Sequence, residues 1–360
     1  MPNLNTVNFI KTLRKDAPFS GIFVIKSRQV RTAKTGGNFF SAVFGDKTGS
    51  FSCTIFSDGG AYETIRDLEE GDIVRVEGLS GTYKEKFSPR ITYVAPVSEA
   101  EIEREGLADM LTETSPEDFD ELCAELEDHI AAIPHEGLRK VTRAVLDELG
   151  DTFKNSTAAI AMHHAYRHGL LEHSCHLARV ARALLPIYPQ VDASLAISGA
   201  LLHDVGKTLE YAQTMVAKRT RLGILHGHIV LGYRIVRRHA LKNKLDPTLQ
   251  ERLEHLILSH QGKLEWGAAV LAATPEALFI SKVDEFDATM GMVQEALRNT
   301  VAGEEFSDKI PGLDMRQILV TPPFQREKKC ATEARDNNAA PDAETSYELP
   351  PEPFGTLFED

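Results

Sequence analysis

Two apolar helical runs between residues 169 and 207 are interrupted by polar side chains, and this feature constrains the fold more than any other. His173 interrupts the first run, and the adjacent pair His203 and Asp204 follows Leu201 and Leu202 in the second. Burying such groups without partners costs a few kcal/mol, so they must be hydrogen-bonded or bound to a metal. The pattern therefore predicts a helical core built around a polar or metal-binding site.

From residue 137 to residue 298, apolar residues recur with the period of an α-helix. Turns interrupt this pattern, and one of them covers Gly223–Gly227. Hydrophobic residues that recur every three or four positions predict an all-α domain. Residues 299–321 are expected to form an ordered closing segment of that domain, which we place at residues 137–321. The apolar side chains available for packing in this segment are Ile310, Leu313, Ile318 and Leu319.

Residues 17–97 have a different pattern, because apolar and polar residues alternate over short runs separated by turn residues. This period of two is typical of strands with one buried face. Five strands with a helix after the third, here Ala61–Leu68, is the order of an OB-fold, a small Greek-key barrel. The sequence thus predicts a multidomain α+β protein in which a small N-terminal β-barrel precedes an all-α domain. The expected strands are Ser20–Lys26, Phe39–Phe44, Ser50–Phe56, Asp72–Leu79 and Arg90–Ala95.

Residues 17–97 also resemble the nucleic-acid-binding OB domains of the tRNA-anticodon type, through Phe39-Phe40, Asp46-x-Thr48-Gly49 and Gly71-Asp72-x-Val74. The resemblance implies an exposed face on which bases stack against aromatic rings while cations follow the phosphates. For each candidate, the alternative of a core residue or a solvated rim stays open. The candidates for binding nucleic acid are Arg28, Arg31, Lys34, Phe39, Tyr83, Lys84, Lys86 and Arg90.

The net charge of −13 is concentrated in a connector and a tail, so it does not exclude nucleic acid as a ligand. Residues 99–136 contain 14 acidic side chains and 1 basic one, whereas residues 1–98 contain 13 basic and 10 acidic side chains. Local charge decides whether a polyanion is attracted. We expect residues 98–136 to form an acidic helical spacer, in which Ser115 is the N-cap of a helix that carries Pro116 in its first turn.

Residues 1–16 are expected to form an N-terminal extension, and residues 322–360 a disordered acidic tail. The tail regains aromatic residues at Phe354 and Phe358, so it either docks a protein partner or has no role. Apolar runs stay shorter than the roughly 18 residues of a membrane span, and the N-terminus lacks a signal-peptide pattern. Four scattered cysteines predict reduced thiols in a cytoplasmic protein without membrane contact, and a homo-oligomer is compatible with this composition.

Further polar residues break the apolar pattern of the helical domain, each near the end of an apolar stretch. A single histidine on an apolar face is usually a hydrogen-bonded core residue, but a series of histidines and aspartates is harder to explain in that way. Imidazole and carboxylate ligands together suit Mn, Fe, Co, Ni or Zn rather than the all-oxygen sites of Mg or Ca. The series consists of His163, His164, His173, His203, Asp204, His228, His260 and Asp284.

The order His173, His203-Asp204 and Asp284 resembles the H…HD…D pattern of the HD-domain metal-dependent phosphohydrolases. Over residues 17–320 the chain is also similar to the YhaM family, whose members are 3′→5′ exoribonucleases that join an OB-fold to an HD domain. The motifs that carry this similarity are Leu170-Leu171-Glu172-His173, Leu202-His203-Asp204-Val205-Gly206-Lys207, Gly227-His228-Ile229, Ile257-Leu258-Ser259-His260 and Asp284-x-x-Asp287-Ala288.

The resemblance implies a centre of two divalent transition-metal ions that share Asp204 as a bridging ligand. Manganese is the expected metal, with Co, Fe, Ni or Zn as alternatives. Gln261 stands where a second histidine is usual in the family, which bears on the second ion. The implied ligands are His173, His203, Asp204 and Asp284 for the first ion, and His228 and His260 for the second.

The resemblance also implies roles around the metals. Lys207 would face the phosphate, so that Asp204 and Lys207 are the expected catalytic residues, and His163 and His164 would line the entrance. Asp287 either orients a ligand or caps a turn, and both alternatives stay open. His176, three residues after His173, is expected to take no part in supporting the ligands.

Together with these residues, the resemblance implies a metal-dependent 3′→5′ exonuclease that hydrolyses single-stranded RNA, with single-stranded DNA as a further candidate, to nucleoside 5′-monophosphates. Hydrolysis of a phosphodiester anion needs a nucleophile formed near neutral pH, which two metals supply. One alternative is a phosphohydrolase of small nucleotides, but such a substrate needs no strand-binding barrel. Another is a nucleic-acid-binding regulator with a silent HD domain, against which the complete set of implied ligands argues.

Overall fold

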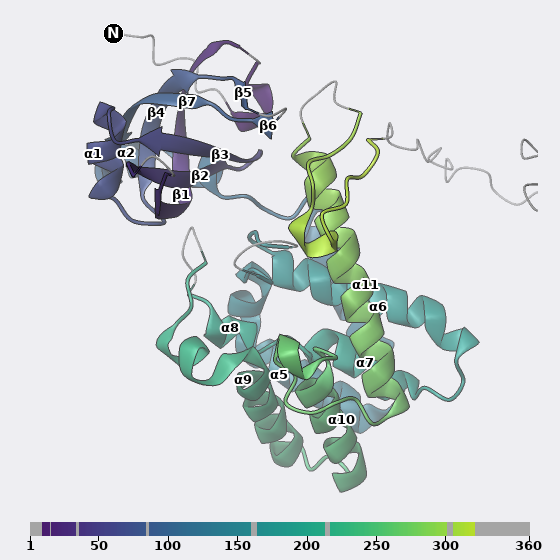
Figure 1. Ribbon diagram of the computed structural model, residues 1–360. Coiled ribbons are helices and arrows are strands. Elements are labelled where there is room, and N and C mark those ends of the chain that lie inside the picture. The colour runs from purple at the N-terminus through teal and green to yellow at the C-terminus, as the bar shows by residue number, and fades with distance from the viewer. Residues whose placement is uncertain are drawn as a thin grey trace, which may run out of the picture. The chain divides into compact units, whose positions relative to one another are not determined.

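The computed structural model describes residues 9–14, 16–33, 36–83, 86–159, 164–212, 217–300 and 305–320. Strands occupy the first part of the chain and helices the second, as Figure 1 shows by colour. The predicted α+β organisation, with a small barrel followed by a helical domain, is confirmed. The predictions for Lys34, Lys84, His163 and the tail after residue 321 fall outside the described residues.

The barrel is a five-stranded antiparallel sheet in the order β3-β2-β1-β4-β7. Its longest strand, β1, pairs with β4 over its first half and with β2 over its second, and the register shifts between Ile25 and Ser27. Such a bulge increases the local twist and helps a sheet to curl into a barrel. The elements are η1 (Ile10–Thr12), β1 (Pro18–Thr32), β2 (Asn38–Asp46), β3 (Gly49–Phe56), α1 (Gly60–Arg66), β4 (Ile73–Leu79), β5 (Thr82–Tyr83), β6 (Lys86–Phe87) and β7 (Arg90–Pro96).

Aromatic side chains fill the barrel. Phe23, Phe44 and Phe51 are buried against one another, with ring centroids 5.5 to 5.7 Å apart in the contacts that Phe51 makes with the other two. Phe40 is 2% exposed and belongs to this core, whereas its neighbour Phe39 points to the other face and is half-buried. The alternation along β2 therefore separates the two phenylalanines into a core residue and a surface residue.

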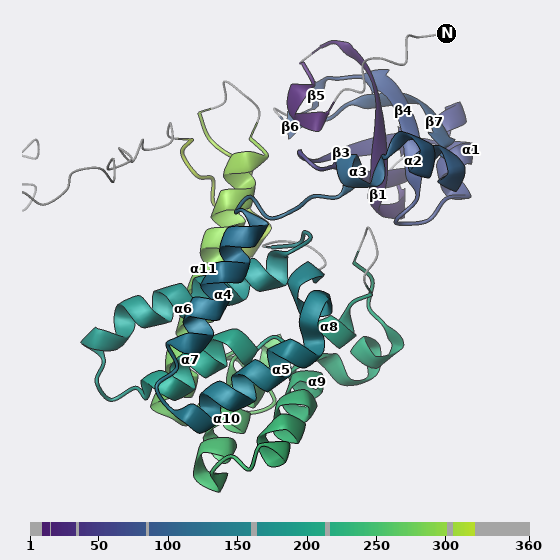
Figure 2. The same cartoon turned by 180° about the vertical axis from the view of Figure 1, so that it is seen from behind.

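The acidic stretch 98–136 is not one spacer, because its two halves pack in different places. In the first half, α2 (Glu99–Glu105) and α3 (Ala108–Leu111) bring Leu107 and Leu111 against Ile22 and Ile73 of the barrel. In the second half, α4 (Phe119–Ala131) buries its apolar stripe in the helical core, where it packs against α5 and α6 (Figure 2). The stretch is thus helical and joins the two domains, but its helices pack on those domains and do not form a separate unit.

The start of α4 also differs from the expected one. Asp118, not Ser115, is the N-cap, since its carboxylate accepts hydrogen bonds from the backbone N–H groups of Asp120 and Glu121. The Ser115 hydroxyl instead accepts from the backbone N–H of Glu117 in the preceding turn. Both residue types are good N-caps, so composition alone placed the helix start three residues too early.

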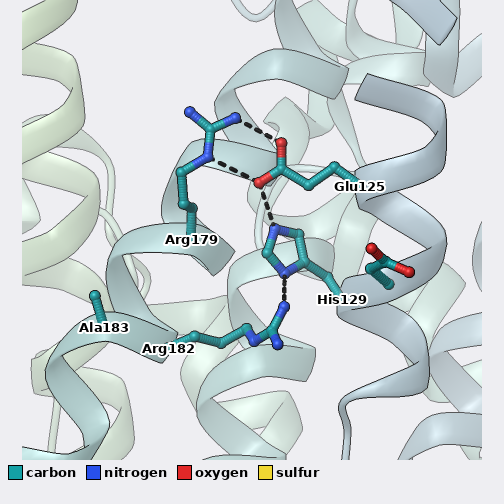
Figure 3. Close-up of a pocket in the computed structure, with 6 residues that line it drawn as sticks. Glu125, His129, Arg179, Arg182 and Ala183 are labelled. Atoms are coloured by element: carbon teal, nitrogen blue, oxygen red, sulfur yellow. Dashed lines mark hydrogen bonds and ion pairs between the residues drawn. The ribbon is translucent and has the colours of Figure 1, made fainter. Parts of the chain in front are cut away.

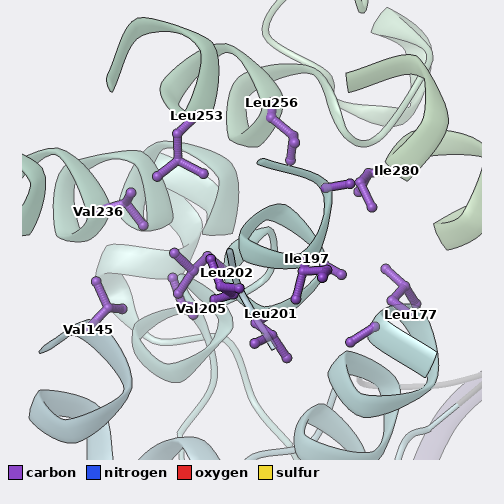
Figure 4. Packing of buried hydrophobic residues seen from close by; sticks show 14 of the residues in the cluster. Val145, Leu177, Ile197, Leu201, Leu202, Val205, Val236, Leu253, Leu256 and Ile280 are labelled. Carbon is purple, nitrogen blue, oxygen red and sulfur yellow. The ribbon is translucent and has the colours of Figure 1, made fainter. Parts of the chain in front are cut away.

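The helical domain is organised around α7 (Ala193–Leu202), which is buried from Ser194 to its end. Figure 4 shows Leu201, Leu202 and Val205 among side chains of the surrounding helices. Burial of each large aliphatic side chain stabilises the fold by roughly 1.5–3 kcal/mol. The remaining elements are α5 (Glu136–Asn155), α6 (Gly169–Leu184), η2 (Leu185–Ile187), α8 (Lys207–Glu210), α9 (Arg221–Lys242), α10 (Pro247–Ser259), η3 (Leu264–Trp266), α11 (Pro275–Arg298) and η4 (Pro311–Leu313).

Two glycines bring the motifs of this domain together. A Cβ atom on Gly206 would lie 1.9 Å from the carbonyl oxygen of His228, so only glycine allows α8 to approach α9 this closely. Gly227 has φ +67° and interrupts α9 directly before His228, a conformation that suits glycine. The predicted turn over Gly223–Gly227 is thus a single kink inside a helix.

The closing segment is ordered over residues 305–320 but packs less than predicted. Ile310 is buried, Leu313 and Ile318 are half-buried, and Leu319 is 46% exposed. Isolated β-bridges between Phe306 and Leu319 and between Ile310 and Arg316 hold its two ends together.

Candidate metal centre

The predicted metal ligands converge from five helices onto one buried point. His203 is the C-cap residue of α7 and Asp204 follows it, while His260 caps α10 and the other three lie within α6, α9 and α11. In the first half of the centre, Nε2 of His173 lies 3.1 Å from Nε2 of His203 and 3.3 Å from Oδ1 of Asp284.

Asp204 lies between two groups of histidines. Its Oδ2 atom is 3.3 Å from Nε2 of His203 and 3.6 Å from Nε2 of His173. Its Oδ1 atom is 3.4 Å from Nε2 of His228 and 3.5 Å from Nε2 of His260. Each carboxylate oxygen therefore faces a different pair of imidazoles, which is the arrangement a bridging ligand needs.

Two of the histidines are oriented by the peptide backbone. Nδ1 of His203 lies 3.0 Å from the carbonyl oxygen of Ala200, and Nδ1 of His260 lies 2.8 Å from that of Ile257. A carbonyl oxygen only accepts hydrogen bonds, so in both rings Nδ1–H is the donor. In a neutral imidazole the lone pair is then on Nε2, which faces the centre of the site.

The other two histidines are oriented by carboxylates. Nδ1 of His173 donates to Oδ2 of Asp287 at 2.7 Å, and Nδ1 of His228 donates to Oε2 of Glu210 at 2.8 Å. A carboxylate behind an imidazole fixes the tautomer and makes the opposite nitrogen a better ligand. All four rings thus present the same nitrogen, Nε2, to the same volume.

Unsatisfied polar atoms at this point fit a bound cation. Among the described residues, Oδ1 of Asp204 and Nε2 of His228 are buried and lack a hydrogen-bond partner, although they lie close together. Leaving a buried polar atom unpaired costs about 1–3 kcal/mol, which coordination would relieve. At this point three sets of side chains each have ligand atoms within 4.8 Å of one another: His173 with His203 and Asp204, His203 with His260 and Asp284, and Asp204 with His228 and His260.

The charges of the site also favour a cation. Burial works to raise the pKa of Asp204, but Lys207 and His203 outweigh it and hold this pKa well below its usual range. For Asp284, burial is outweighed mainly by the hydrogen bond from His173, which lowers the pKa to about 2. Both carboxylates are therefore ionised at neutral pH.

Lys207 lies at the edge of this centre, where its Nζ atom is 2.5 Å from Oδ2 of Asp204. Burial disfavours the ammonium, but the Asp204 carboxylate outweighs burial and raises the pKa of Lys207. The side chain keeps 12% of its surface exposed, so a cation is held beside the carboxylates with access to solvent.

His164 does not line an entrance, and that prediction was wrong. It is 2% exposed, its Nε2 donates to Oδ2 of Asp287 at 2.9 Å, and its Nδ1 lies 3.0 Å from the hydroxyl of Tyr166. Only the family resemblance implied that His163 and His164 line the entrance. The chain instead turns inward at His164, where φ is +51°.

Three supporting residues were missed or left open by the sequence. Asp287 accepts a hydrogen bond from Nδ1 of His173, a contact that fits the first of its two predicted roles. His176 also bonds Asp287, contrary to the expectation that it takes no part. Glu210 was not singled out; its only signal is an acidic residue within an otherwise apolar turn after Lys207, and it is 3% exposed.

On the barrel, the candidates for nucleic-acid contact divide into two groups. Arg31 and Arg90 are exposed, and Arg31, Phe39 and Phe56 form one cross-strand row, with the two rings 6.0 Å apart. Phe56, which the sequence reasoning omitted, is 59% exposed. Tyr83 and Lys86 pair on the β5–β6 hairpin.

Arg28 belongs to the other group, because the fold already uses its guanidinium. Nη1 donates to the carbonyl oxygens of Ile65 and Arg66 at the end of α1, and the group lies over the Phe40 ring at 5.8 Å. Arg28 therefore attaches α1 to the sheet, and the prediction that it binds nucleic acid does not fit this position.

No helix in the described part of the chain is long and apolar enough to cross a membrane. Two family models match the chain, one over the helical domain that holds the metal centre and one over the barrel. A family model described as an HD domain matches residues 170–289, and one described as an OB-fold nucleic acid binding domain matches residues 24–97. A solved structure of a replication factor A related protein from Methanobacterium thermoautotrophicum is 16% identical, with a TM-score of 0.21, over 27% of this chain and 96% of its own.

Relatives similar over most of the chain carry one name. The 3′-5′ exoribonuclease YhaM of Listeria innocua is 30% identical over 303 residues, which cover 84% of this chain and 94% of the relative. The protein of the same name from a Geobacillus strain is 29% identical, over 82% of this chain and 89% of its own. With an OB-fold and an HD domain in this order, the chain belongs to the YhaM family of 3′–5′ exoribonucleases.

Proposed function

We propose that this protein is a metal-dependent 3′→5′ exonuclease that hydrolyses single-stranded RNA to nucleoside 5′-monophosphates. One observation carries the proposal: four Nε2 atoms and two carboxylates converge on one buried point, with Asp204 between two pairs of histidines. Membership of an exoribonuclease family supports the substrate class. The barrel supports a strand as the substrate, because a small nucleotide needs no such module.

The proposed centre holds two ions. His173, His203, Asp204 and Asp284 would bind the first, and His228 and His260 would bind the second together with Asp204. Gln261 follows the second group without displacing His260, whose Nε2 still faces Asp204. We propose manganese as the metal, with Co, Fe, Ni or Zn as alternatives, since these ions accept both imidazole and carboxylate ligands.

Such ions, when bound, supply a nucleophile at neutral pH and neutralise the charge that develops on the phosphate. The protein itself orients the metal-binding atoms and places charged side chains beside them. Lys207 offers its ammonium to a non-bridging phosphate oxygen, where a point cation suits the dianionic charge that develops. Asp204, ionised and held by Lys207, keeps both halves of the centre at a fixed separation.

The barrel would hold the strand through stacking and charge. Phe39 and the exposed Phe56 offer ring faces to bases, and Arg31 at the end of the same row offers charge to a phosphate. Arg90 and, from the sequence, Lys34, Tyr83, Lys84 and Lys86 remain proposed contacts. A cytoplasmic location, which the free thiols of Cys53, Cys123 and Cys175 support, a homo-oligomer and docking by the tail also stay predictions.

The test uses 5′-labelled single-stranded RNA and DNA of equal length, incubated with metal-stripped protein to which Mn, Co, Zn or Mg is restored. We expect products that shorten by one nucleotide at a time from the 3′ end, with nucleoside 5′-monophosphates released. Internal fragments, or hydrolysis of free nucleotides alone, would contradict the proposal. The RNA and DNA arms measure which strand is preferred.

A further inference from the structure

A buried cluster of charged side chains lies behind His173, on the side of the ring away from the metal centre. Asp287, which is 7% exposed, receives hydrogen bonds from three imidazoles. Its Oδ2 atom lies 2.7 Å from Nδ1 of His173 and 2.9 Å from Nε2 of His164, and its Oδ1 atom lies 3.1 Å from Nδ1 of His176. Donors at both oxygens prevent the carboxylate from rotating.

His176 extends this cluster towards the surface. Its Nε2 atom lies 2.8 Å from Oε1 of Glu117, so each ring nitrogen faces a carboxylate oxygen. Carboxylates accept hydrogen bonds, so both nitrogens are donors and the ring is an imidazolium. The other oxygen of Glu117 accepts from Arg179 at 3.1 Å. A continuous series of charged hydrogen bonds thus runs from Arg179 to His173.

His164 fixes Asp287 from the other side. Its Nδ1 atom lies 3.0 Å from the Tyr166 hydroxyl and 3.6 Å from Oε2 of Glu172, so the ring is held at both nitrogens. The loop that carries it is itself anchored, since the carbonyl oxygen of His164 accepts from the backbone N–H of Ala158. Asp287 therefore has a rigid donor on each side of the bond that it makes to His173.

We propose that Asp287, His164, His176 and Glu117 are positioning residues that hold the His173 ring for metal binding. The inference depends on the proposed function at one point, which is that His173 binds a metal. Glu117 lies six residues after Leu111, the end of α3 on the barrel, and two residues before the start of α4. A residue of the segment that joins the two domains thus supports a ligand of the metal centre.

The test measures metal binding directly. Metal-stripped full-length protein is titrated with Co²⁺, and the visible absorption bands report both the affinity and the geometry of the ligands. We expect Asp287→Asn to weaken Co²⁺ binding about 10- to 100-fold and to shift the bands, because His173 loses its charged acceptor. Glu117→Gln leaves an acceptor but removes the charge, and we expect a smaller loss of about threefold.

The matched control is Glu125→Gln. Glu125 lies on α4 near Glu117 and pairs with the same Arg179, but its other hydrogen bond goes to His129 (Figure 3). If only the ion pairs at the surface matter, Glu125→Gln and Glu117→Gln will have equal effects. We expect Glu125→Gln to bind Co²⁺ as the unaltered protein does, and an equal loss in both variants would overturn the inference.

Unchanged Co²⁺ affinity and bands in both Asp287→Asn and Glu117→Gln would also overturn it. Should Asp287→Asn not fold, as judged by circular dichroism, the decision falls to Glu117→Gln, whose side chain is 37% exposed in the folded protein. RNA hydrolysis is followed in parallel. Unaltered protein that binds Co²⁺ but shortens no RNA would refute the proposed function, while the effect of the variants on Co²⁺ would still decide the positioning role.

Discussion

The four histidines of the candidate metal centre are supported in two different ways. His203 and His260 cap α7 and α10, and each donates to a carbonyl oxygen three residues earlier in its own helix. His173 and His228 donate to carboxylates that are 114 and 18 residues away in the sequence. The first pair is oriented by local helix geometry, whereas the second depends on tertiary packing and on charge.

This difference predicts where the site is robust. A helix end that carries a histidine keeps the same carbonyl acceptor as long as the helix is formed. A carboxylate acceptor can be changed by one substitution, by packing or by pH. The carbonyl-backed pair, His203 and His260, should therefore tolerate changes elsewhere, and the carboxylate-backed pair, His173 and His228, should respond to them.

Asp204→Ala should have the largest effect, because Asp204 faces both pairs. We expect RNA hydrolysis to fall at least about 100-fold and the bound metal to decrease, since both ions lose their shared ligand. The measurement is the hydrolysis rate together with the metal content after dialysis. The barrel should keep its fold, which binding of single-stranded RNA reports. Full activity in a purified Asp204→Ala protein would show that the two pairs do not form one centre.

The contrast between local and tertiary support also explains which parts of the fold and the site could be predicted from the sequence. Strands and helices followed from period and turn residues, and the ligands that interrupt apolar runs stood out because burial demands partners for them. His203 and His260 were also recognisable by their position at helix ends. Asp287 was visible as a second acid one turn after Asp284, but three histidines from elsewhere decide its role.

Other parts of the site could not be predicted from local sequence. His164 was expected to line the entrance, but it has positive φ and lies buried, with a tertiary hydrogen bond to Asp287. Glu210 looked like an ordinary acidic residue until α9 brought His228 to it. Arg28 looked free to bind phosphate until α1 placed two carbonyl oxygens against it.

Gly206→Ala should have the next largest effect. The added methyl group would push α8 away from α9 and so move Glu210 away from His228. The added Cβ would meet the His228 carbonyl oxygen at 1.9 Å. Relieving such a clash typically costs about 1–3 kcal/mol, and we expect the upper part of that range in the free energy of unfolding. Urea unfolding followed by the fluorescence of Trp266, the single tryptophan of the chain, reports this domain.

Gly232→Ala is the matched control for that contact. Gly232 faces Gly206 from α9, but its Cβ would lie 3.3 Å from the nearest atom, so there is more room. Alanine also favours the helix by about 1 kcal/mol over glycine. We expect the stability of Gly232→Ala to stay within about 1 kcal/mol of the unaltered protein. A Gly206→Ala protein as stable as this control would mean that α8 and α9 can separate without cost.

Glu210→Gln should weaken only the half of the centre that contains His228. A neutral acceptor behind His228 makes Nε2 a weaker ligand, and we expect the second ion to bind about tenfold less tightly while the first is retained. Elemental analysis after dialysis at limiting Mn²⁺ counts both ions. The control is Arg219→Gln, which removes a neighbour 3.5 Å from the other oxygen of Glu210 but leaves the His228 contact intact. Equal loss of both ions in Glu210→Gln would show that the halves are not independent.

The last effect concerns pH, and it separates supporting side chains that titrate from backbone carbonyls that do not. Burial lowers the pKa of His176, but the hydrogen bonds to Asp287 and Glu117 outweigh it and raise the pKa from 6.5 to about 9. Because the folded-state pKa is the higher one, the charged ring stabilises the fold fully below pH 6.5, and this contribution is lost as the pH rises through 9. The carbonyl oxygens behind His203 and His260 do not themselves titrate. In metal-stripped protein we expect the difference in unfolding free energy between unaltered protein and His176→Gln to shrink by on the order of 3 kcal/mol from pH 6.5 to pH 9.5, because one unit of pKa shift is worth about 1.4 kcal/mol. A difference that is constant over this range would mean that His176 supports His173 by its shape and not by its charge.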